Sequence, residues 1–264
     1  MEQENKSNKS YDQYNPKSSR GEEAPTRKIT RREMIVGAAG LSLGALVAFT
    51  GARFDEYTRD QEILSSAPEY SAAEKNLVIE WLPDTVKRWE PQIEKYSNEY
   101  KIDPNLLAIM MTVESGGDPT ADSGVAKGLM QIIDSTAEDI NERLVADKKT
   151  DYDLFNPDTS VEFGAAYIRY LIDQFSDPRH GPSWDETVSV VAAGYNGGQD
   201  AANLYLKNKW EGLESYDRQT LNYTRYVRVM WQERHDPLSF TYRYWHDTAN
   251  GKALVDKAEQ YRLP

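Results

Sequence analysis

The segment 103–117 limits the possible folds more than any other, because it reads as one apolar helix with its own start and stop signals. Asp103 followed by Pro104 is typical of a helix start, with an acidic N-cap and a proline in the first turn. Steps of three and four residues then give an apolar face wide enough for a largely buried helix: Leu106, Leu107, Met110, Met111 and Val113. Paired glycines at positions 116 and 117 stop the helix just after Glu114.

Helical patterns continue along most of the chain, and they predict a mainly α-helical domain over residues 84–235. Further helices are expected over residues 84–101, 157–175, 199–207 and 218–233. Within the first of these, Pro91 would kink or split the helix. Ser135-Thr136-Ala137-Glu138 reads as a capping box that opens one more helix, and Ser183-Trp184-Asp185-Glu186 as a second, whose helix ends in the glycine-rich stretch 194–198. Alternating patterns typical of strands are few.

Composition excludes several classes of site. The chain has no cysteine, so disulfides, thiolate metal sites and thiol nucleophiles are ruled out. Its three histidines, at 180, 235 and 246, lack metal-ligand spacing, so no metal and no cofactor are expected. The formal net charge of −12 argues against a nucleic-acid partner, which needs clustered Lys and Arg.

The first fifty residues have the character of an export signal. Residues 1–33 are polar, cannot bury enough surface to fold, and end near Arg31-Arg32. An apolar run follows at 34–52, as in twin-arginine signals, although Met34 and Ile35 stand where such signals usually carry Phe and Leu. The competing interpretation is an uncleaved membrane anchor in contact with the bilayer.

Both interpretations leave residues 1–33 in the cytoplasm and place the rest outside the cytoplasmic membrane, in the cell envelope or secreted. Residues 53–83 are expected to form a linker or a loose first helix. The aromatic tail 236–264 is expected to pack on the domain, with an extension of a binding groove as the alternative. Nothing in the sequence indicates more than a monomer.

Glu114 is the leading candidate for chemistry. Its carboxyl follows an apolar helix at the carbonyl end, where the helix dipole disfavours negative charge, and burial would act in the same direction. A carboxylic acid that keeps its proton can donate it to a glycosidic oxygen. The alternative is an ordinary surface glutamate at a fraying helix end.

A second candidate segment begins 14 residues later. Gly128-Leu129-Met130-Gln131-Ile132 combines a tight glycine turn with a long apolar side chain and a neutral amide suited to sugar hydroxyls. Taken alone, it could equally be a helix start with a buried methionine. The 17 tyrosines and six tryptophans also suit a sugar groove, or simply fill a helical core.

Four short motifs together resemble the soluble-lytic-transglycosylase-type (SLT) domains, which are lysozyme-like and similar in fold to goose-type lysozyme. They occur in the family's order and spacing: Glu114-Ser115, the segment 128–132, Ala193-Gly194-Tyr195-Asn196-Gly197-Gly198, and Gln219-Thr220-Leu221-Asn222-Tyr223. The last looks like the family's Glu-Thr-x-x-Tyr stretch. The resemblance covers about residues 85–235 and implies a single catalytic domain acting on peptidoglycan glycan strands.

The resemblance also implies roles for individual residues. Glu114, followed by Ser115, would be the one acid/base: it would protonate the leaving oxygen and then take the proton of the muramyl 6-hydroxyl, giving a 1,6-anhydro end. Substrate would be bound by the remaining motif residues: Ser115, Met130, Gln131, Tyr195, Asn196 and Tyr223. Such an intramolecular attack needs no second carboxylate.

Departures from the family pattern leave two alternatives open. Gln219 replaces a frequent Glu, the glycines at 194 and 197 replace alanines, and Asp122 or Ser123 falls where relatives place a groove serine. A second carboxylate from Asp118, Asp122 or Asp134 would allow a water-using, goose-type muramidase reaction. The other alternative, a non-catalytic cell-wall-binding module, would be expected to have lost the acid, and Glu114 is present.

Overall fold

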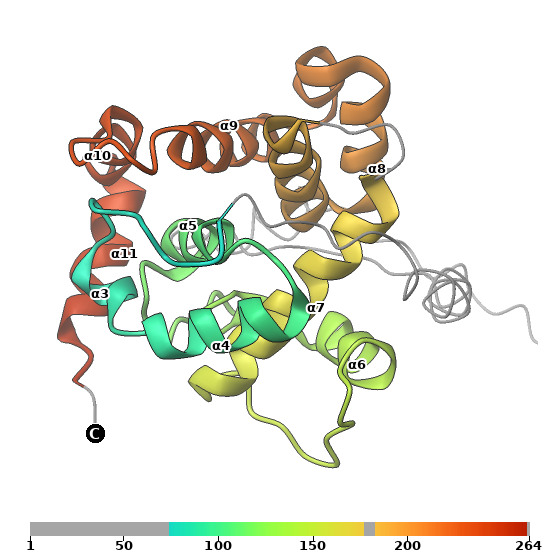
Figure 1. The fold of residues 1–264 in the computed structure, drawn as a ribbon, viewed down its shortest axis with the longest axis vertical. Coiled ribbons are helices and arrows are strands. Elements are labelled where there is room, and N and C mark those ends of the chain that lie inside the picture. Colours follow the sequence, from blue (N-terminus) through green and yellow to red (C-terminus); the bar gives the residue numbers. More distant parts are fainter. Residues whose placement is uncertain (1–73, 177–182, 263–264) are drawn as a thin grey trace, which may run out of the picture.

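The computed structural model describes residues 74–176 and 183–262 and is mainly helical, as the sequence predicts (Figure 1). The helices and the one small hairpin follow in this order: α3 (Asp84–Lys87), α4 (Glu90–Tyr100), α5 (Pro104–Ser115), β1 (Ala126–Lys127), β2 (Ile132–Ile133), α6 (Asp134–Arg143), α7 (Pro157–Phe175), α8 (Trp184–Tyr216), α9 (Arg218–Gln232), α10 (Phe240–His246) and α11 (Ala249–Gln260). The predicted tail 1–33, the apolar segment 34–52 and most of 53–83 lie outside the described residues.

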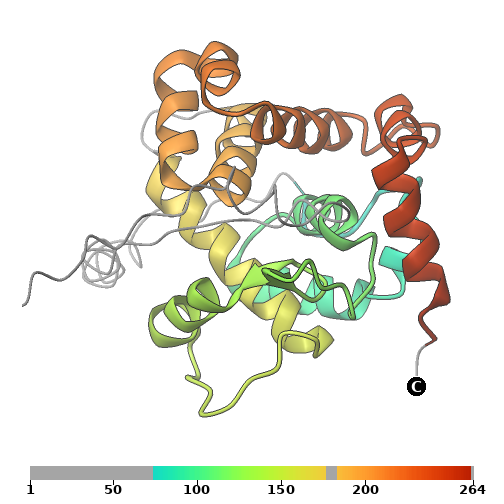
Figure 2. The same cartoon turned by 180° about the vertical axis from the view of Figure 1, so that it is seen from behind.

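Helix α5 forms the centre of the domain. All of its residues are buried, and it contacts α3, α4, α7, α9 and α11 (Figures 1 and 2). The Asp103 carboxylate accepts a hydrogen bond from the Asn105 amide at 2.8 Å, and Gly116 closes the helix with a left-handed backbone, φ 63°. The predicted start and stop are both confirmed. An apolar helix of this kind is stable only when surrounded on all sides.

The predicted helix over 84–101 is divided in two. Pro91 lies in the first turn of α4, where its missing N–H costs no hydrogen bond, so it begins a helix instead of bending one. The short α3 precedes it as a separate turn.

One capping box is confirmed and the other is wrong. The Ser183 side chain accepts a hydrogen bond from the Glu186 amide and caps α8. The box predicted at Ser135 does not form, because α6 already begins at Asp134, directly after the strand β2. Asp134 instead lies 2.8 Å from Lys127, in an exposed ion pair that bridges β1 and the first residue of α6.

Helix α8 is interrupted twice. Gly198 (φ 79°, ψ −178°) and Lys209 (φ 52°, ψ −133°) leave the helical conformation. The sequence predicted that this helix ends in the stretch 194–198. The first break comes only at Gly198, the last residue of that stretch, so residues 193–197 are still helical, and they are buried. Beyond it the chain folds back and α9 packs along α8.

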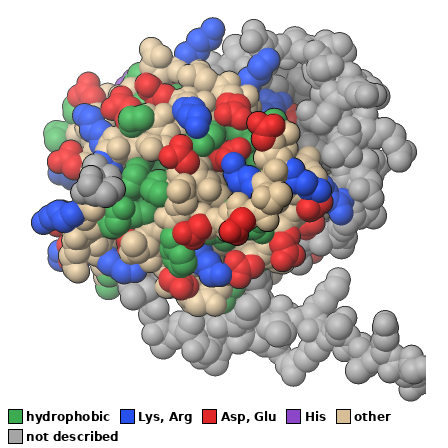
Figure 3. Space-filling view, turned by 90° about the horizontal axis from the view of Figure 1, so that it is seen from below, with side chains coloured by type: hydrophobic (Ala, Val, Ile, Leu, Met, Phe, Trp, Pro, Cys, Tyr) green, Lys and Arg blue, Asp and Glu red, His purple; other side chains and the backbone are tan. Residues whose placement is uncertain are grey.

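The C-terminal helices return to the start of the domain. α11 packs against α5 and α3, and Trp245 of α10 is buried. The aromatic residues of the tail differ in their burial. Tyr242 stacks on Trp81 with ring centroids 4.9 Å apart, whereas Phe240 and Tyr244 are exposed to solvent. One face of the surface shows acidic and basic side chains interspersed (Figure 3). Within residues 74–176 and 183–262, no helix is both long and apolar enough to span a membrane.

Candidate active site

Glu114 is fully buried at the C-terminal end of α5. The chain turns sharply after it, because Gly116 (φ 63°) and Gly117 (φ 87°) both adopt left-handed backbone. The surface-glutamate alternative is therefore wrong for this position. The side chain lies where the end of an apolar helix meets the rest of the core.

Ser115 joins the end of α5 to the segment 128–132. Its hydroxyl donates to the Leu129 carbonyl at 2.8 Å and accepts from the Gly117 amide at 3.1 Å. Ser115 thus holds two parts of the site together through backbone groups.

The segment 128–131 is the connection between β1 and β2. Gly128 (φ 75°) fits only as glycine, since a Cβ there would lie 1.9 Å from the Leu154 carbonyl oxygen. Gln131 also has a left-handed backbone (φ 47°), and its amide nitrogen donates to the carbonyls of Ala121 and Gly128, each at 3.0 Å. Both amide hydrogens of Gln131 thus hold the loop.

Met130 is locked between this loop and α7. Its amide donates to the Ser160 hydroxyl at 3.1 Å, and its side chain lies against Gly164, where a Cβ would come within 2.6 Å of Met130 Cγ. Sequence reasoning missed Ser160 and Gly164. The available signal was the glycine inside an otherwise regular helical pattern, which often marks close packing.

Tyr195 links α8 to the same loop and lies near the acid. Its hydroxyl donates to the Met130 carbonyl at 2.8 Å, and its ring is 5.2 Å from that of Tyr167 between centroids. Burial raises the pKa of the Tyr195 hydroxyl well above its usual range, and Glu114 lies close enough that its carboxylate form would raise it further. Glu114, Met130 and Tyr195, predicted from motifs far apart in the sequence, are therefore neighbours.

The remaining predicted residues converge from α8 and α9. Asn196 is fully buried next to Tyr195, and Gly197 lies so close to Thr220 of α9 that a Cβ would be 2.7 Å from Thr220 Cγ2. Tyr223 is fully buried on α9, which packs against α5. Contacts thus join the four motifs in turn: Ser115 with Leu129, Tyr195 with Met130, and Gly197 with Thr220.

The three aspartates considered as a second carboxylate have structural partners. Asp118 lies 3.1 Å from Lys257 and accepts from the Thr120 amide at 2.9 Å. Asp122 is exposed and accepts from the Gly124 amide at 2.7 Å, and Asp134 pairs with Lys127. Each of the three therefore has a role in its own turn. In the part of the chain that the structure describes, no cluster of three or more His, Asp or Glu could hold a metal.

The Tyr195 hydroxyl makes a stability prediction possible. Tyr195→Phe is expected to lower the free energy of unfolding by about 1–3 kcal/mol, because the buried Met130 carbonyl loses its donor. Urea denaturation measures this, with Tyr244→Phe as the control, since the Tyr244 ring is 59% exposed. Equal unfolding midpoints for the two variants would contradict the assigned bond.

Comparison with known proteins agrees with this arrangement. Residues 91–216 match the family model described as "Transglycosylase SLT domain". A membrane-bound lytic murein transglycosylase E of Buchnera aphidicola is 29% identical over 142 residues, which cover 53% of this chain and 63% of the relative. An endo-type membrane-bound lytic murein transglycosylase A of Cronobacter sakazakii is 38% identical over 114 residues, covering 40% and 53%.

A phage relative extends the comparison. The protein named transglycosylase of Enterobacteria phage PRD1 is 30% identical over 123 residues, covering 46% of this chain and 39% of the relative. The chain thus spans less than two thirds of the length of these curated relatives. The matched residues include the first three motifs and end just before the fourth.

Proposed function

Since this chain contains a transglycosylase SLT domain, we propose that it is a lytic transglycosylase of peptidoglycan. It cleaves the β-1,4 bond between N-acetylmuramic acid and N-acetylglucosamine and leaves 1,6-anhydro-N-acetylmuramic acid ends. The observation that carries the proposal is the fully buried Glu114 at the carbonyl end of α5, beside Tyr195.

Glu114 performs both proton transfers in the proposed reaction. Burial and the helix end both disfavour a carboxylate, so the neutral acid is the form that meets the substrate. It donates its proton to the glycosidic oxygen as the bond to the anomeric carbon of the muramyl residue breaks. The resulting carboxylate then accepts the proton of the 6-hydroxyl of the same sugar, whose oxygen forms the new bond to that carbon.

The other motif residues shape the site around this acid. Ser115 and Tyr195 act through the backbone of residues 129–130, to which they are bonded, and so set the position of Met130. Gln131, Asn196 and Tyr223 are proposed to contact the substrate. The hydrogen-bonded loop holds Gln131 in place before the substrate arrives, and the packed helices α8 and α9 do the same for Asn196 and Tyr223.

The local bonding of the three aspartates considered as a second carboxylate favours the lytic over the hydrolytic outcome. A hydrolase needs a group that holds and activates water, and a carboxylate usually does this. Asp118, Asp122 and Asp134 are each bonded within their own turns. The intramolecular 6-hydroxyl needs no such group.

The cellular setting follows from the substrate. Two of the relatives are named membrane-bound murein transglycosylases. We place this chain likewise in the cell envelope, exported through residues 1–52, with 34–52 as a signal or membrane anchor and the catalytic domain over 84–235. It acts as a monomer and needs no cofactor.

Analysis of released muropeptides tests the proposal. The full chain, incubated with purified sacculi, is expected to release products that end in 1,6-anhydro-N-acetylmuramic acid. Mass spectrometry distinguishes these from reducing ends, which are heavier by one water. Products with reducing ends alone would replace the lytic assignment by the hydrolytic one.

A further inference from the structure

The turn that follows Glu114 is gripped from two sides by segments that lie outside the matched residues 91–216. We propose that residues 84–89 and helix α11 form a clamp on the turn 116–118, and that Lys257 of α11 is a positioning residue for the Glu114 carboxyl. This inference rests on the proposed function for its catalytic consequence. The clamp itself can be tested without catalysis.

Helix α11 supplies the first arm. Its backbone lies against Gly116, where a Cβ would come within 2.9 Å of the Leu254 carbonyl carbon. One turn of helix later, Lys257 Nζ lies 3.1 Å from Asp118 Oδ2, and the Asp118 side chain is only 2% exposed. The Lys257 side chain is 45% exposed, so replacing its ammonium would leave the buried Asp118 carboxylate without its charged partner.

Residues 84–89 supply the second arm. A Cβ on Gly117 would lie 2.1 Å from the Thr85 carbonyl oxygen, so the two backbones are in direct contact. The Trp89 indole N–H donates to the Gly117 carbonyl at 2.9 Å. This bond satisfies a buried carbonyl just beyond the end of α5 and fixes the direction in which the chain leaves the helix.

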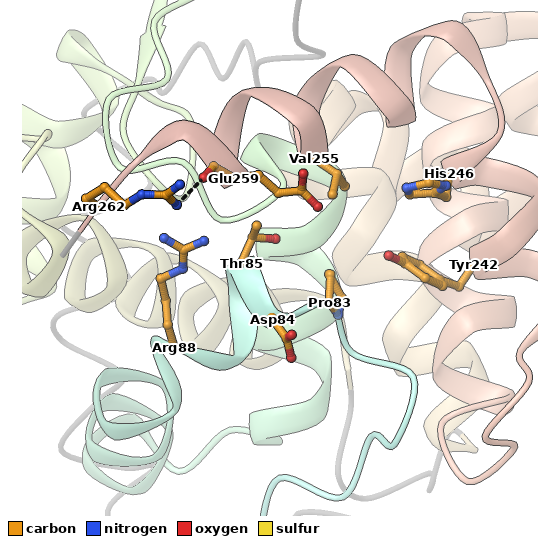
Figure 4. Close-up of a pocket in the computed structure, with 9 residues that line it drawn as sticks. All are labelled: Pro83, Asp84, Thr85, Arg88, Tyr242, His246, Val255, Glu259 and Arg262. Carbon is orange, nitrogen blue, oxygen red and sulfur yellow. Dashed lines mark hydrogen bonds between the residues drawn. The ribbon is translucent and has the colours of Figure 1, made fainter.

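Arg88 links the two arms through hydrogen bonds, and a cavity lies between them beside this link. Arg88 donates to the carbonyls of Tyr261 (2.9 Å) and Ala258 (3.3 Å) at the end of α11. Figure 4 shows Thr85 and Val255, one from each arm, on facing walls of the cavity, whose volume is about 520 Å³. The backbone contact at Gly116 and the polar links at Arg88 and Lys257 together set how closely α11 approaches the turn.

The position of α11 is therefore transmitted to the acid. Glu114 lies two residues before the clamped Gly116, and left-handed glycines give the turn little resistance of its own to displacement. General acid catalysis depends on sub-ångström placement of the proton donor. Loosening the clamp is thus expected to slow the chemical step more than it weakens substrate binding.

Lys257→Gln in the full chain tests this, with Lys252→Gln as the matched control. Lys252 lies on the same helix and pairs at 2.8 Å with Asp256, within α11 itself. On soluble, uncrosslinked glycan strands, Lys257→Gln is expected to lower kcat on the order of tenfold with KM nearly unchanged. Lys252→Gln should match the unmodified chain, and Lys257→Arg should retain most of kcat because it keeps the charge.

Hydrogen exchange of the amides at 116–118 gives a readout independent of catalysis. Exchange there is expected to speed up in Lys257→Gln and not in Lys252→Gln. Equal exchange and equal kcat in the two variants would overturn the clamp. If the unmodified chain released no cleaved glycan, the proposed function would fail, while faster exchange in Lys257→Gln alone would still support the clamp.

Discussion

Glu114→Gln is expected to abolish glycan cleavage while leaving the fold intact. The amide keeps the shape of the side chain in its buried site but has no acidic proton to donate and cannot accept one from the 6-hydroxyl. General acid–base catalysis contributes about 10²–10⁴-fold, and here one residue makes both transfers, so the loss should reach the upper end of that range. The measurement is the rate at which anhydro-muropeptides are released from sacculi.

A matched control separates the loss of the catalytic acid from the loss of any buried carboxyl group. Glu162 on α7 is also buried, and it pairs with Lys149 at 2.9 Å. Glu162→Gln should retain cleavage. Thermal unfolding and sedimentation with sacculi should show that Glu114→Gln still folds and still binds glycan. Cleavage by Glu114→Gln at the rate of the Glu162→Gln control would exclude the proposed mechanism.

Local signals in the sequence were sufficient for most of the helical framework. The N-cap at Asp103 and the paired glycines after Ser115 define α5, because the Asp103 carboxylate accepts a hydrogen bond from the Asn105 amide and the glycines adopt the left-handed backbone that ends the helix. The prediction of a capping box at Ser135 was wrong, because the pairing of β2 with β1 and not the local sequence pattern determines where α6 begins. With Ser135 as the N-cap the helix would begin at Thr136, but it follows directly from β2 and begins two residues earlier, at Asp134.

The sequence motifs predicted which residues would lie close together but not how they are bonded. The order of the motifs predicted that Glu114, Met130 and Tyr195 would be neighbours. The hydrogen bond that the Tyr195 hydroxyl donates to the Met130 carbonyl could not be predicted, because no side-chain pattern in the sequence indicates it. The contacts of Lys257 with Asp118 and of Gly164 with Met130 join residues distant in sequence. Such contacts depend on how helices pack, and a single sequence carries no direct signal for that.

Gly128→Ala is expected to cause the largest loss of stability among simple substitutions in the site. The left-handed backbone (φ 75°) is strained for alanine. The alanine Cβ would also lie 1.9 Å from the Leu154 carbonyl oxygen and 2.8 Å from Ser160 Oγ. A backbone carbonyl cannot rotate away, so the loop must shift. The expected cost is roughly 3 kcal/mol or more in the free energy of unfolding.

Gly124→Ala isolates the steric part of that cost. Gly124 has a similar backbone (φ 79°), but nothing lies within 4 Å of a Cβ placed there. Its substitution should cost only the left-handed strain, about 1 kcal/mol. Urea unfolding of the two variants measures the difference, and equal losses would mean that Leu154 does not confine the loop. Because the displaced loop carries Met130 and Gln131, Gly128→Ala should also lose cleavage under conditions where it remains folded, whereas Gly124→Ala should retain it.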